Sequence, residues 1–353
     1  MSQRPNVNDV SVIAPHFSRL LSGVTSTVVR LVSRQAAQIP IVAVGPGLPA
    51  SLPQVPILSL LTMSRFGPDG WRVWHARRNI EMLAGLALRV LLGKRLKLIF
   101  TSASQRNHSH YMRWLIRRMD AVLATSDKSA RYLECQSHVI SHGIDTVEFS
   151  PTDDKRALRS ALDLPDGGKL IGCFGRIRVS KGTDLFITSA IDLCKRHDNL
   201  NAVVLGQAVG KDKAFLHALK HRVLTAGLKD RILFREQVPV TAIADMYRAL
   251  DIYVAPQRWE GFGLTPLEAM ACGVPVVAAD VGTFSSQIVQ GETGYIVAPG
   301  SEPAITDAIE VLLLHTKRRA EFALSARAHV QTNFDIQKEA DALIQTYRNL
   351  IGK

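Results

Sequence analysis

The stretch APQRWEGFGLTPLEAMACGVPVVAAD (residues 255–280) holds two acids, Glu260 and Glu268, between apolar and small residues. The short apolar runs DIYVAP (251–256) and PVVAAD (275–280) at its ends are typical of strands buried on both faces of a parallel sheet. Because Glu260 follows the first run, we expect it at the carboxyl end of a strand. Ligands bind at that edge of such sheets. The stretch therefore predicts an α/β fold with a ligand site beside Glu260.

Similar runs recur along the chain, with helical patterns between them. In the first half, strands are expected over residues 10–14, 40–45, 96–102 and 120–125, and helices over residues 24–33 and 71–92. In the second half, strands are expected over residues 169–175, 201–206 and 231–236, and helices over residues 184–197 and 334–350. The alternation predicts doubly wound parallel sheets. At 353 residues the chain is long enough for two domains with a cleft between them.

The composition fits a packed globular protein in a reducing compartment. Apolar residues make up 46% of the chain and charged residues 21%. The first nine residues are polar and unlike a signal peptide, and the apolar run 82–92 is far short of the ~20 residues that span a bilayer. The four cysteines show no disulfide framework or paired metal spacing: Cys135, Cys173, Cys194 and Cys272. We therefore expect a cytoplasmic protein.

The positive charge is concentrated in the first half. Residues 1–150 contain 18 Lys and Arg against 8 Asp and Glu, whereas residues 151–353 contain 25 against 23. Such a field favours an anionic partner, which could be nucleic acid, an acidic lipid surface or a charged sugar. A generally basic proteome is the alternative explanation.

A basic loop follows the expected strand 169–175. In GRIRVSKGTD (175–184), Gly175 permits a tight exit from the strand, and Thr183 is expected to cap the next helix. Arg176 and Lys181 would then lie above a helix N-terminus, where anions are favoured. The two cations are suited to binding a diphosphate and stabilising it as a leaving group. The loop is not a Walker motif, and a solvated basic loop is the alternative.

The two acids of the opening stretch have different structural explanations. TPLE (265–268) fits a capping box with Thr265 as N-cap, Pro266 at the first helical position and Glu268 at N3. Capping would account for Glu268 without any ligand. Glu260 lies before the glycines and outside any cap, which makes it the better functional candidate.

Three segments resemble one family. EGFGLTPLEAMACGVPVVA (260–278), with its E-x7-E pattern, closely resembles the donor-site signature of the GT-B retaining glycosyltransferases grouped as family 4. FGRIRVSKGTDLFI (174–187) resembles that family's phosphate loop, and VISHGIDTVEFSP (139–151) its interdomain linker. The resemblance implies two Rossmann-like domains facing each other across a cleft: an acceptor domain (1–148) and a donor domain (149–334). It also implies a C-terminal helix (335–353) that packs back on the first domain.

The resemblance also assigns roles to residues. Arg176 and Lys181 would hold the diphosphate of a nucleotide sugar, Glu260 the transferred sugar and Glu268 the ribose. Backbone amides near the sugar and phosphates, together with an N-terminal glycine loop, would complete the donor site: Gly261, Phe262, Gly263, Leu264 and Gly23. The family resemblance implies neither a metal cofactor nor a covalent intermediate.

The chain departs from the family at one position. A histidine commonly ends the strand that corresponds to residues 96–102, but Ala103 stands there in this chain. His108 or His110 could substitute for it. A metal at these histidines is not expected, because a third ligand is missing and the chain contains no Asp-x-Asp.

The basic half is expected to bind the acceptor. Residues 71–78 and 106–120 mix Trp, Tyr and Arg as surface-lying segments do, although helix packing with snorkelling arginines explains them equally well. The acceptor and membrane candidates are Arg106, His108, Arg113, Arg117 and Arg118. The whole sequence looks most like lipopolysaccharide core mannosyltransferases of α-proteobacteria. That likeness implies GDP-mannose as donor, an anionic Kdo–lipid acceptor, and a peripheral position on the inner face of the cytoplasmic membrane.

Other functions remain open from the residues alone. The enzyme could use another nucleotide sugar, or a polysaccharide or other glycolipid acceptor. A sugar-nucleotide epimerase of the same architecture is disfavoured because no catalytic base is evident. Nucleic-acid binding, suggested by the pI of 9.8, is disfavoured because the basic runs are short and no reader motif occurs.

Overall fold

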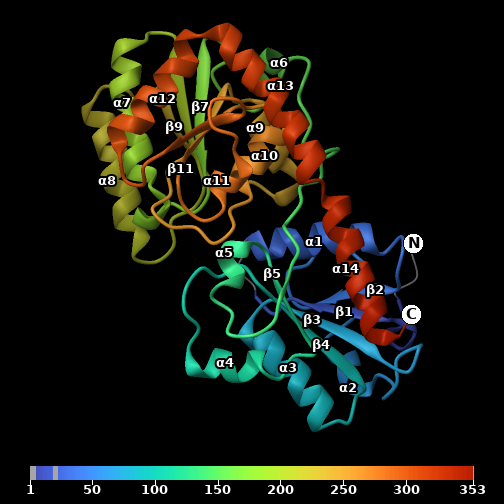
Figure 1. Cartoon of the computed structure of the whole chain (residues 1–353). Coiled ribbons are helices and arrows are strands. Elements are labelled where there is room, and N and C mark those ends of the chain that lie inside the picture. Colours follow the sequence, from blue (N-terminus) through green and yellow to red (C-terminus); the bar gives the residue numbers. More distant parts are fainter. Residues whose placement is uncertain (1–4, 19–22, 353) are drawn as a thin grey trace. The chain divides into compact units, whose positions relative to one another are not determined.

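The computed structural model describes residues 5–18 and 23–352 and divides into two compact units. Unit 1 consists of Met1–Gly143 and Ile336–Lys353, and unit 2 consists of Ile144–Asp335. The change of unit between Gly143 and Ile144 lies a few residues before the boundary expected from the sequence. Figure 1 shows a sheet covered by helices in each unit.

In its described part, unit 1 contains a six-stranded parallel sheet with the strand order β2-β1-β3-β4-β5-β6. Its strands are β1 Val12–Pro15, β2 Ile41–Val44, β3 Arg72–Ala76, β4 Leu96–Ser102, β5 Ala121–Ala124 and β6 His138–Val139. Its helices are α1 Gly23–Gln35, α2 Ser59–Thr62, α3 Asn79–Val90, α4 His110–Ile116, α5 Asp127–Ala130 and α14 Ile336–Ile351, with a 3-10 turn at Val7–Asp9.

The two faces of this sheet pack against different helices. Helices α1 and α14 supply the core on one face, and α2, α3 and α4 supply it on the other. The C-terminal helix α14 is therefore part of unit 1, although its sequence follows that of unit 2. A buried polar contact joins it to the sheet, where the Tyr347 hydroxyl lies 2.7 Å from His75 Nδ1.

The expectation of one helix over residues 71–92 is wrong, because the segment contains strand β3 followed by α3. All five residues of β3 are buried, so the strand shows no alternation of polar and apolar residues. Arg72 is buried because its guanidinium donates to the carbonyls of Val10 (2.7 Å) and Asn8 (3.2 Å). Residues 71–78 are therefore largely core and not a surface-lying segment.

In unit 2, a second six-stranded parallel sheet has the order β12-β11-β10-β7-β8-β9. Its strands are β7 Lys169–Phe174, β8 Leu200–Leu205, β9 Ile232–Arg235, β10 Ile252–Ala255, β11 Val276–Ala279 and β12 Gly294–Val297. Its helices are α6 Lys155–Ala161, α7 Thr183–Arg196, α8 Asp212–Thr225, α9 Ile243–Arg248, α10 Thr265–Ala271, α11 Phe284–Gln287, α12 Glu302–Leu314 and α13 Thr316–Asn333, with 3-10 turns at Val179–Lys181 and Val240–Ala242.

The winding direction of unit 2 reverses between β7 and β10. From β7 the chain proceeds outward through β8 to β9, and then returns to β10 on the other side of β7 and proceeds to β12. The carboxyl ends of β7 and β10 therefore form a topological switch point, where sheets of this type bind ligands. The two segments that leave these strands are the basic loop and the Glu260 stretch.

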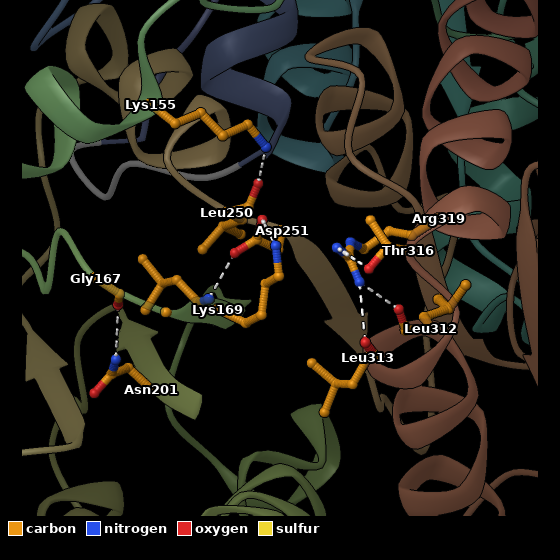
Figure 2. Close-up of polar contacts among 12 residues, drawn as sticks. Lys155, Gly167, Lys169, Asn201, Leu250, Asp251, Leu312, Leu313, Thr316 and Arg319 are labelled. Atoms are coloured by element: carbon orange, nitrogen blue, oxygen red, sulfur yellow. Dashed lines mark hydrogen bonds and ion pairs between the residues drawn. The ribbon is translucent and has the colours of Figure 1, made fainter. Parts of the chain in front are cut away.

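A charged cluster fixes the amino ends of the same two strands. Asp251, just before β10, accepts hydrogen bonds from the Leu170 amide (2.8 Å) and from Arg159 Nη2 (2.7 Å). Figure 2 shows Lys155 beside it, donating to the Leu250 carbonyl. Burial alone would raise the pKa of Asp251, but Arg159 and Lys155 bring that pKa below its ordinary value. The ionised cluster holds β7 and β10 in register and so positions their carboxyl ends.

The contact between α14 and β3 generates a stability prediction. Burial lowers the pKa of His75 well below its ordinary value, so its ring is neutral and needs partners at both nitrogens. These are Tyr347 and the Thr101 hydroxyl, each at 2.7 Å. Tyr347→Phe should lower the free energy of unfolding by about 1–3 kcal/mol, because it leaves a buried polar atom unpaired. Urea unfolding checks this, with the exposed Tyr132→Phe as control; equal stability of both variants contradicts the contact.

Candidate active site at the switch point of unit 2

The basic loop, residues 175–182, connects β7 to α7 and packs against the end of β10. It leaves β7 at Gly175, passes through the 3-10 turn Val179–Lys181 and ends at Gly182 in a left-handed conformation (φ 69°). A Cβ atom on Gly182 would lie 1.9 Å from the Pro256 carbonyl oxygen. Glycine is therefore required there, and its absence of a side chain lets Lys181 approach the Glu260 segment.

The expected cap at Thr183 is not present. Helix α7 begins at Thr183 itself, and its N-cap is Gly182, which has no side chain to cap the helix. The Asp184 carboxylate in the first turn instead faces the amides of Asp184 and Leu185. An anion is favoured at such a position by the helix dipole.

Lys181 and Glu260 form an ion pair at the centre of the site. Lys181 Nζ donates to Glu260 Oε2, and Glu260 Oε1 accepts from the Gly261 amide at 3.0 Å. Both charged side chains are largely buried. The structure therefore brings Lys181, which was expected to bind the diphosphate, into direct contact with Glu260, which was expected to bind the sugar.

Arg258 ties the loop to the Glu260 segment, and the sequence analysis missed it. Its guanidinium makes two 2.7 Å bonds to the two carboxylate oxygens of Asp184, and Nη1 also donates to the Val179 carbonyl at 2.7 Å. The Arg258 amide donates to Ser180 at 3.0 Å. The pair could have been suspected from the sequence, because an arginine lies two residues before Glu260 and an acid, Asp184, lies in the first turn of α7.

Arg258 and Asp184 form an ion pair in which Asp184 is charged at neutral pH. Burial would raise the pKa of Asp184, but Arg258 lowers that pKa below its ordinary value. The carboxylate is therefore ionised at neutral pH, and the bidentate geometry fixes both its oxygens. The loop and the strand β10 are held together by charge as well as by packing.

The glycine stretch after Glu260 is oriented by two further residues. The Phe262 carbonyl accepts from Thr283 Oγ1 at 2.7 Å, and the Gly263 carbonyl accepts from Gln287 Nε2 at 3.1 Å. In a trans peptide the carbonyl and the next amide point in opposite directions. The amides of Gly263 and Leu264 consequently point away from Thr283 and Gln287, neither of which the sequence analysis identified.

The capping box expected at TPLE is wrong. Leu264 is the N-cap of α10 without a side-chain bond, and Thr265 is already helical. Glu268 lies one position further into the helix, and its carboxylate accepts from the buried Tyr247 hydroxyl at 2.8 Å. Burial, and then Glu268, raise the pKa of Tyr247 well above its ordinary value, so Tyr247 remains a donor. Capping therefore does not explain Glu268.

The two remaining donor candidates lie at loop and helix ends. Arg176 follows Gly175 directly and is exposed in the basic loop. Gly23 is the first residue of α1, and residues 19–22 before it lie outside the described residues. The structure thus places Lys181 in contact with Glu260. Arg176 lies on the same loop as Lys181.

The five acceptor candidates in unit 1 lie on and around α4, and three of them, His108, Arg113 and Arg117, interact electrostatically with Glu134. Arg106 and His108 lie between β4 and α4, where burial, and then Arg106, lower the pKa of His108. Arg113 lies on α4 and pairs with Glu134 (2.7 Å), while Arg117 and Arg118 follow the end of α4. They occupy successive positions along α4 and the loop before it.

A histidine that the sequence analysis overlooked follows β1. His16 is buried, with Nε2 3.2 Å from Thr25 Oγ1 and Nδ1 3.5 Å from Arg78 Nη1. Burial, and then Arg78 and Arg77, lower the pKa of His16 to about 4, so its ring is neutral at physiological pH. It lies between β1 and β3, at the switch point of the unit 1 sheet. The signal was a histidine placed directly after the first strand.

No group of three or more His, Cys, Asp or Glu with metal-binding geometry occurs among the residues that the structure describes. Nor does any helix in that part of the chain have the length and apolarity needed to span a membrane.

Comparison with known proteins now gives the class. Residues 154–329, which contain the basic loop and the Glu260 stretch of unit 2, match the family "Glycosyl transferases group 1". The lipopolysaccharide core biosynthesis mannosyltransferase LpsB of Rhizobium meliloti (strain 1021) is 50% identical over 351 residues, 98% of this chain and 99% of LpsB. The corresponding LpcC of Rhizobium leguminosarum bv. viciae is 47% identical over 352 residues, 99% of each chain.

The chain belongs to the group 1 glycosyltransferases, and it is an enzyme of the hexosyltransferase type. Its fold is GT-B. Anabaena HepE, solved with UDP and glucose, has a TM-score of 0.80 over 96% of this chain and 99% of HepE at 18% identity, which shows the fold alone. The whole-length similarity to the two Rhizobium enzymes places the chain with lipopolysaccharide core mannosyltransferases.

The Arg258–Asp184 pair should be a positioning contact for the donor. Arg258→Met should weaken nucleoside diphosphate binding by about tenfold, the worth of one strong charge-assisted contact. Asp184→Asn should give a similar loss, because it releases the same loop. Calorimetric titration measures both, with Arg156→Met as control, since Arg156 pairs with Asp166 in an exposed ion pair of the same unit. Wild-type affinity in Arg258→Met would exclude the positioning role.

Proposed function

We propose that this enzyme transfers mannose from GDP-mannose, with retention of configuration, to an anionic Kdo–lipid acceptor of the lipopolysaccharide core. The observation that carries the proposal is the Lys181–Glu260 pair at the switch point of unit 2. It lies within the residues that match the family, in a chain half identical to a lipopolysaccharide core mannosyltransferase.

The donor would bind with its diphosphate on the basic loop. Arg176 and Lys181 supply the cations, and the start of α7 adds the positive end of its dipole. The ribose would be held by Glu268, whose carboxylate retains acceptor capacity beyond its bond with Tyr247. The amides of the stretch Gly261, Phe262, Gly263 and Leu264 would face the sugar and phosphates.

Catalysis would consist mainly of leaving-group stabilisation. As the bond between the anomeric carbon of mannose and the diphosphate oxygen breaks, negative charge grows on the diphosphate. Nearby cations stabilise the transition state, which carries this charge, more than they stabilise the bound ground state. Lys181 would move from Glu260 to the diphosphate when the donor binds. The released Glu260 carboxylate would then accept hydrogen bonds from the hydroxyls of the mannose.

The acceptor would be recognised by the basic unit 1. A Kdo–lipid carries carboxylates and phosphates, and Arg106, His108, Arg113, Arg117 and Arg118 belong to a half of the chain with a strong positive excess. Such an acceptor lies in a membrane, so we expect the enzyme at the inner face of the cytoplasmic membrane. No metal cofactor is expected, because Arg176 and Lys181 would supply the positive charge.

The direct test is transfer of mannose from GDP-mannose to detergent-dispersed Kdo–lipid, followed by mass spectrometry and NMR of the new anomeric centre. We expect an α-mannoside, formed equally well with EDTA or with Mg²⁺. Transfer from UDP-glucose but not GDP-mannose contradicts the donor assignment. Activity that vanishes in EDTA and returns with Mn²⁺ contradicts the metal-free mechanism.

Substitutions of Glu260 and Glu268 should differ in their effect on the stability of the protein. Glu260→Gln should reduce mannose transfer by about a hundredfold or more, comparable to the loss of one transition-state contact. It should lower the melting temperature less than Glu268→Gln does, because the Lys181 ammonium that it leaves unpaired is partly exposed. Glu268→Gln should lower activity and also stability, because the buried Tyr247 hydroxyl loses its carboxyl partner.

Melting curves and initial rates measure the difference between these two acids. The exposed Lys211→Met, in the same unit, is the control for nonspecific loss of charge. An equal fall of melting temperature in both glutamate variants would count against the separate roles.

A further inference from the structure

Helix α3 in unit 1 is apolar on both of its faces. Its inner face contributes Met82 and Leu86 to the core. A surface helix ordinarily carries polar residues on the opposite side. Here that side is formed by exposed or half-buried apolar residues at helical spacing, which we call the apolar stripe: Ile80, Leu83, Ala87, Val90 and Leu91. Val90 and Leu91 expose 71% and 78% of their surface.

An aromatic pair on α4 continues this surface. The rings of Tyr111 and Trp114 stack with centroids 6.4 Å apart and an interplanar angle of 15°, and both are exposed. Arg89 of α3 donates to the Arg118 carbonyl (2.9 Å), and the Arg118 guanidinium lies 3.9 Å from the Trp114 ring centre. Figure 1 shows α3 and α4 as neighbours on the same side of unit 1. The apolar stripe and the aromatic pair together form the α3–α4 face.

The charge around this face is mostly positive. Residues 77–118 contain ten Lys and Arg and a single acid, Glu81. Glu81 is buried, and its Oε2 accepts from the amides of Arg77 (2.8 Å) and Arg78 (3.0 Å). Two acids beyond this segment reach the face, and each is paired at 2.7 Å: Asp120 with Arg89, and Glu134 with Arg113. An apolar surface bordered by cations is thus exposed to solvent.

We propose that the α3–α4 face docks on a bilayer that contains anionic lipid, with the apolar stripe and Trp114 in the headgroup region and the arginines on lipid phosphates. Apolar residues on one face with Arg at the border are characteristic of interfacial helices, and Trp and Tyr are favoured at that depth. The inference rests on the proposed function, because a lipid-linked acceptor lies in such a membrane. It adds the surface that meets the membrane.

The same charge argues against a second copy as the occupant. A symmetric dimer would place the same patch of both subunits together. The cations of residues 77–118 would then face each other across a desolvated contact, and the acids at its border, Asp120 and Glu134, are already paired with Arg89 and Arg113. Lipid phosphates instead supply the missing negative charge.

Vesicle binding with matched variants tests the proposal. Wild-type protein should sediment with vesicles of phosphatidylethanolamine and phosphatidylglycerol, and should bind phosphatidylcholine vesicles weakly. The triple variant Leu83→Gln, Val90→Gln, Leu91→Gln should bind the anionic vesicles at least about tenfold more weakly, because it removes exposed apolar area only. The control Leu224→Gln, Leu314→Gln, Leu324→Gln changes exposed leucines of unit 2 and should bind normally.

Two tryptophans of equal exposure give a second measurement. Trp114 on the α3–α4 face is 43% exposed, and Trp259 in unit 2 is 45% exposed. Brominated lipids should quench the fluorescence of the Trp259→Phe variant, which keeps Trp114. They should quench the Trp114→Phe variant much less. Both variants retain Trp71 and Trp74, which therefore contribute equally to the two signals.

Normal vesicle binding by the triple stripe variant overturns the proposal, as does equal quenching of Trp114 and Trp259. Gel filtration adds a third outcome: a stripe variant that loses an oligomer but keeps vesicle binding shows a contact between copies and also overturns it. Transfer to detergent-dispersed acceptor is measured in parallel. If the wild type lacks transfer to the dispersed acceptor, the proposed function fails, whatever the result of the vesicle-binding experiment. If the stripe variant keeps this transfer and loses vesicle binding, both proposals are supported.

Discussion

The ion pair between Lys181 and Glu260 is the contact around which the candidate site of unit 2 is built. A largely buried ammonium or carboxylate is costly unless it is paired, and these two side chains satisfy each other at the switch point of unit 2. Their meeting requires Gly182, since a side chain there would collide with Pro256. It also requires Arg258, which joins the loop to the next strand through Asp184.

The rest of unit 2 fixes the two strands that carry this pair. At their amino ends, Asp251 accepts hydrogen bonds from the β7 backbone and from Arg159. At their carboxyl ends, Thr283 and Gln287 orient the glycine stretch after Glu260. A frame fixed at both ends confines these charges to a small region, so that only a short movement of Lys181 is needed, which favours the preorganisation that electrostatic catalysis requires.

The sequence predicted most of the architecture, because short buried strands and amphipathic helices leave distinct patterns. The strands at residues 96–102 and 251–256 and the helix at residues 184–197 were correctly placed to within a residue or two. Strand β3 was missed because Arg72 and His75 are buried polar residues, whose partners come from distant segments. The capping errors at Thr183 and Thr265 have a similar origin, since tertiary contacts at Gly182 and Glu268 override local preference. Arg258 escaped notice because its importance depends on Asp184, 74 positions away.

One binding measurement tests most directly whether Lys181 stays paired with Glu260 until a diphosphate takes the place of the Glu260 carboxylate. Calorimetry with GDP alone compares the wild type, Glu260→Gln and Lys181→Met. If the carboxylate competes with the ligand for Lys181, Glu260→Gln should bind GDP at least as tightly as the wild type, while Lys181→Met binds about tenfold more weakly or worse. In the double variant the effect of Glu260→Gln should disappear. A Glu260→Gln variant that loses GDP affinity as much as Lys181→Met does would contradict the exchange.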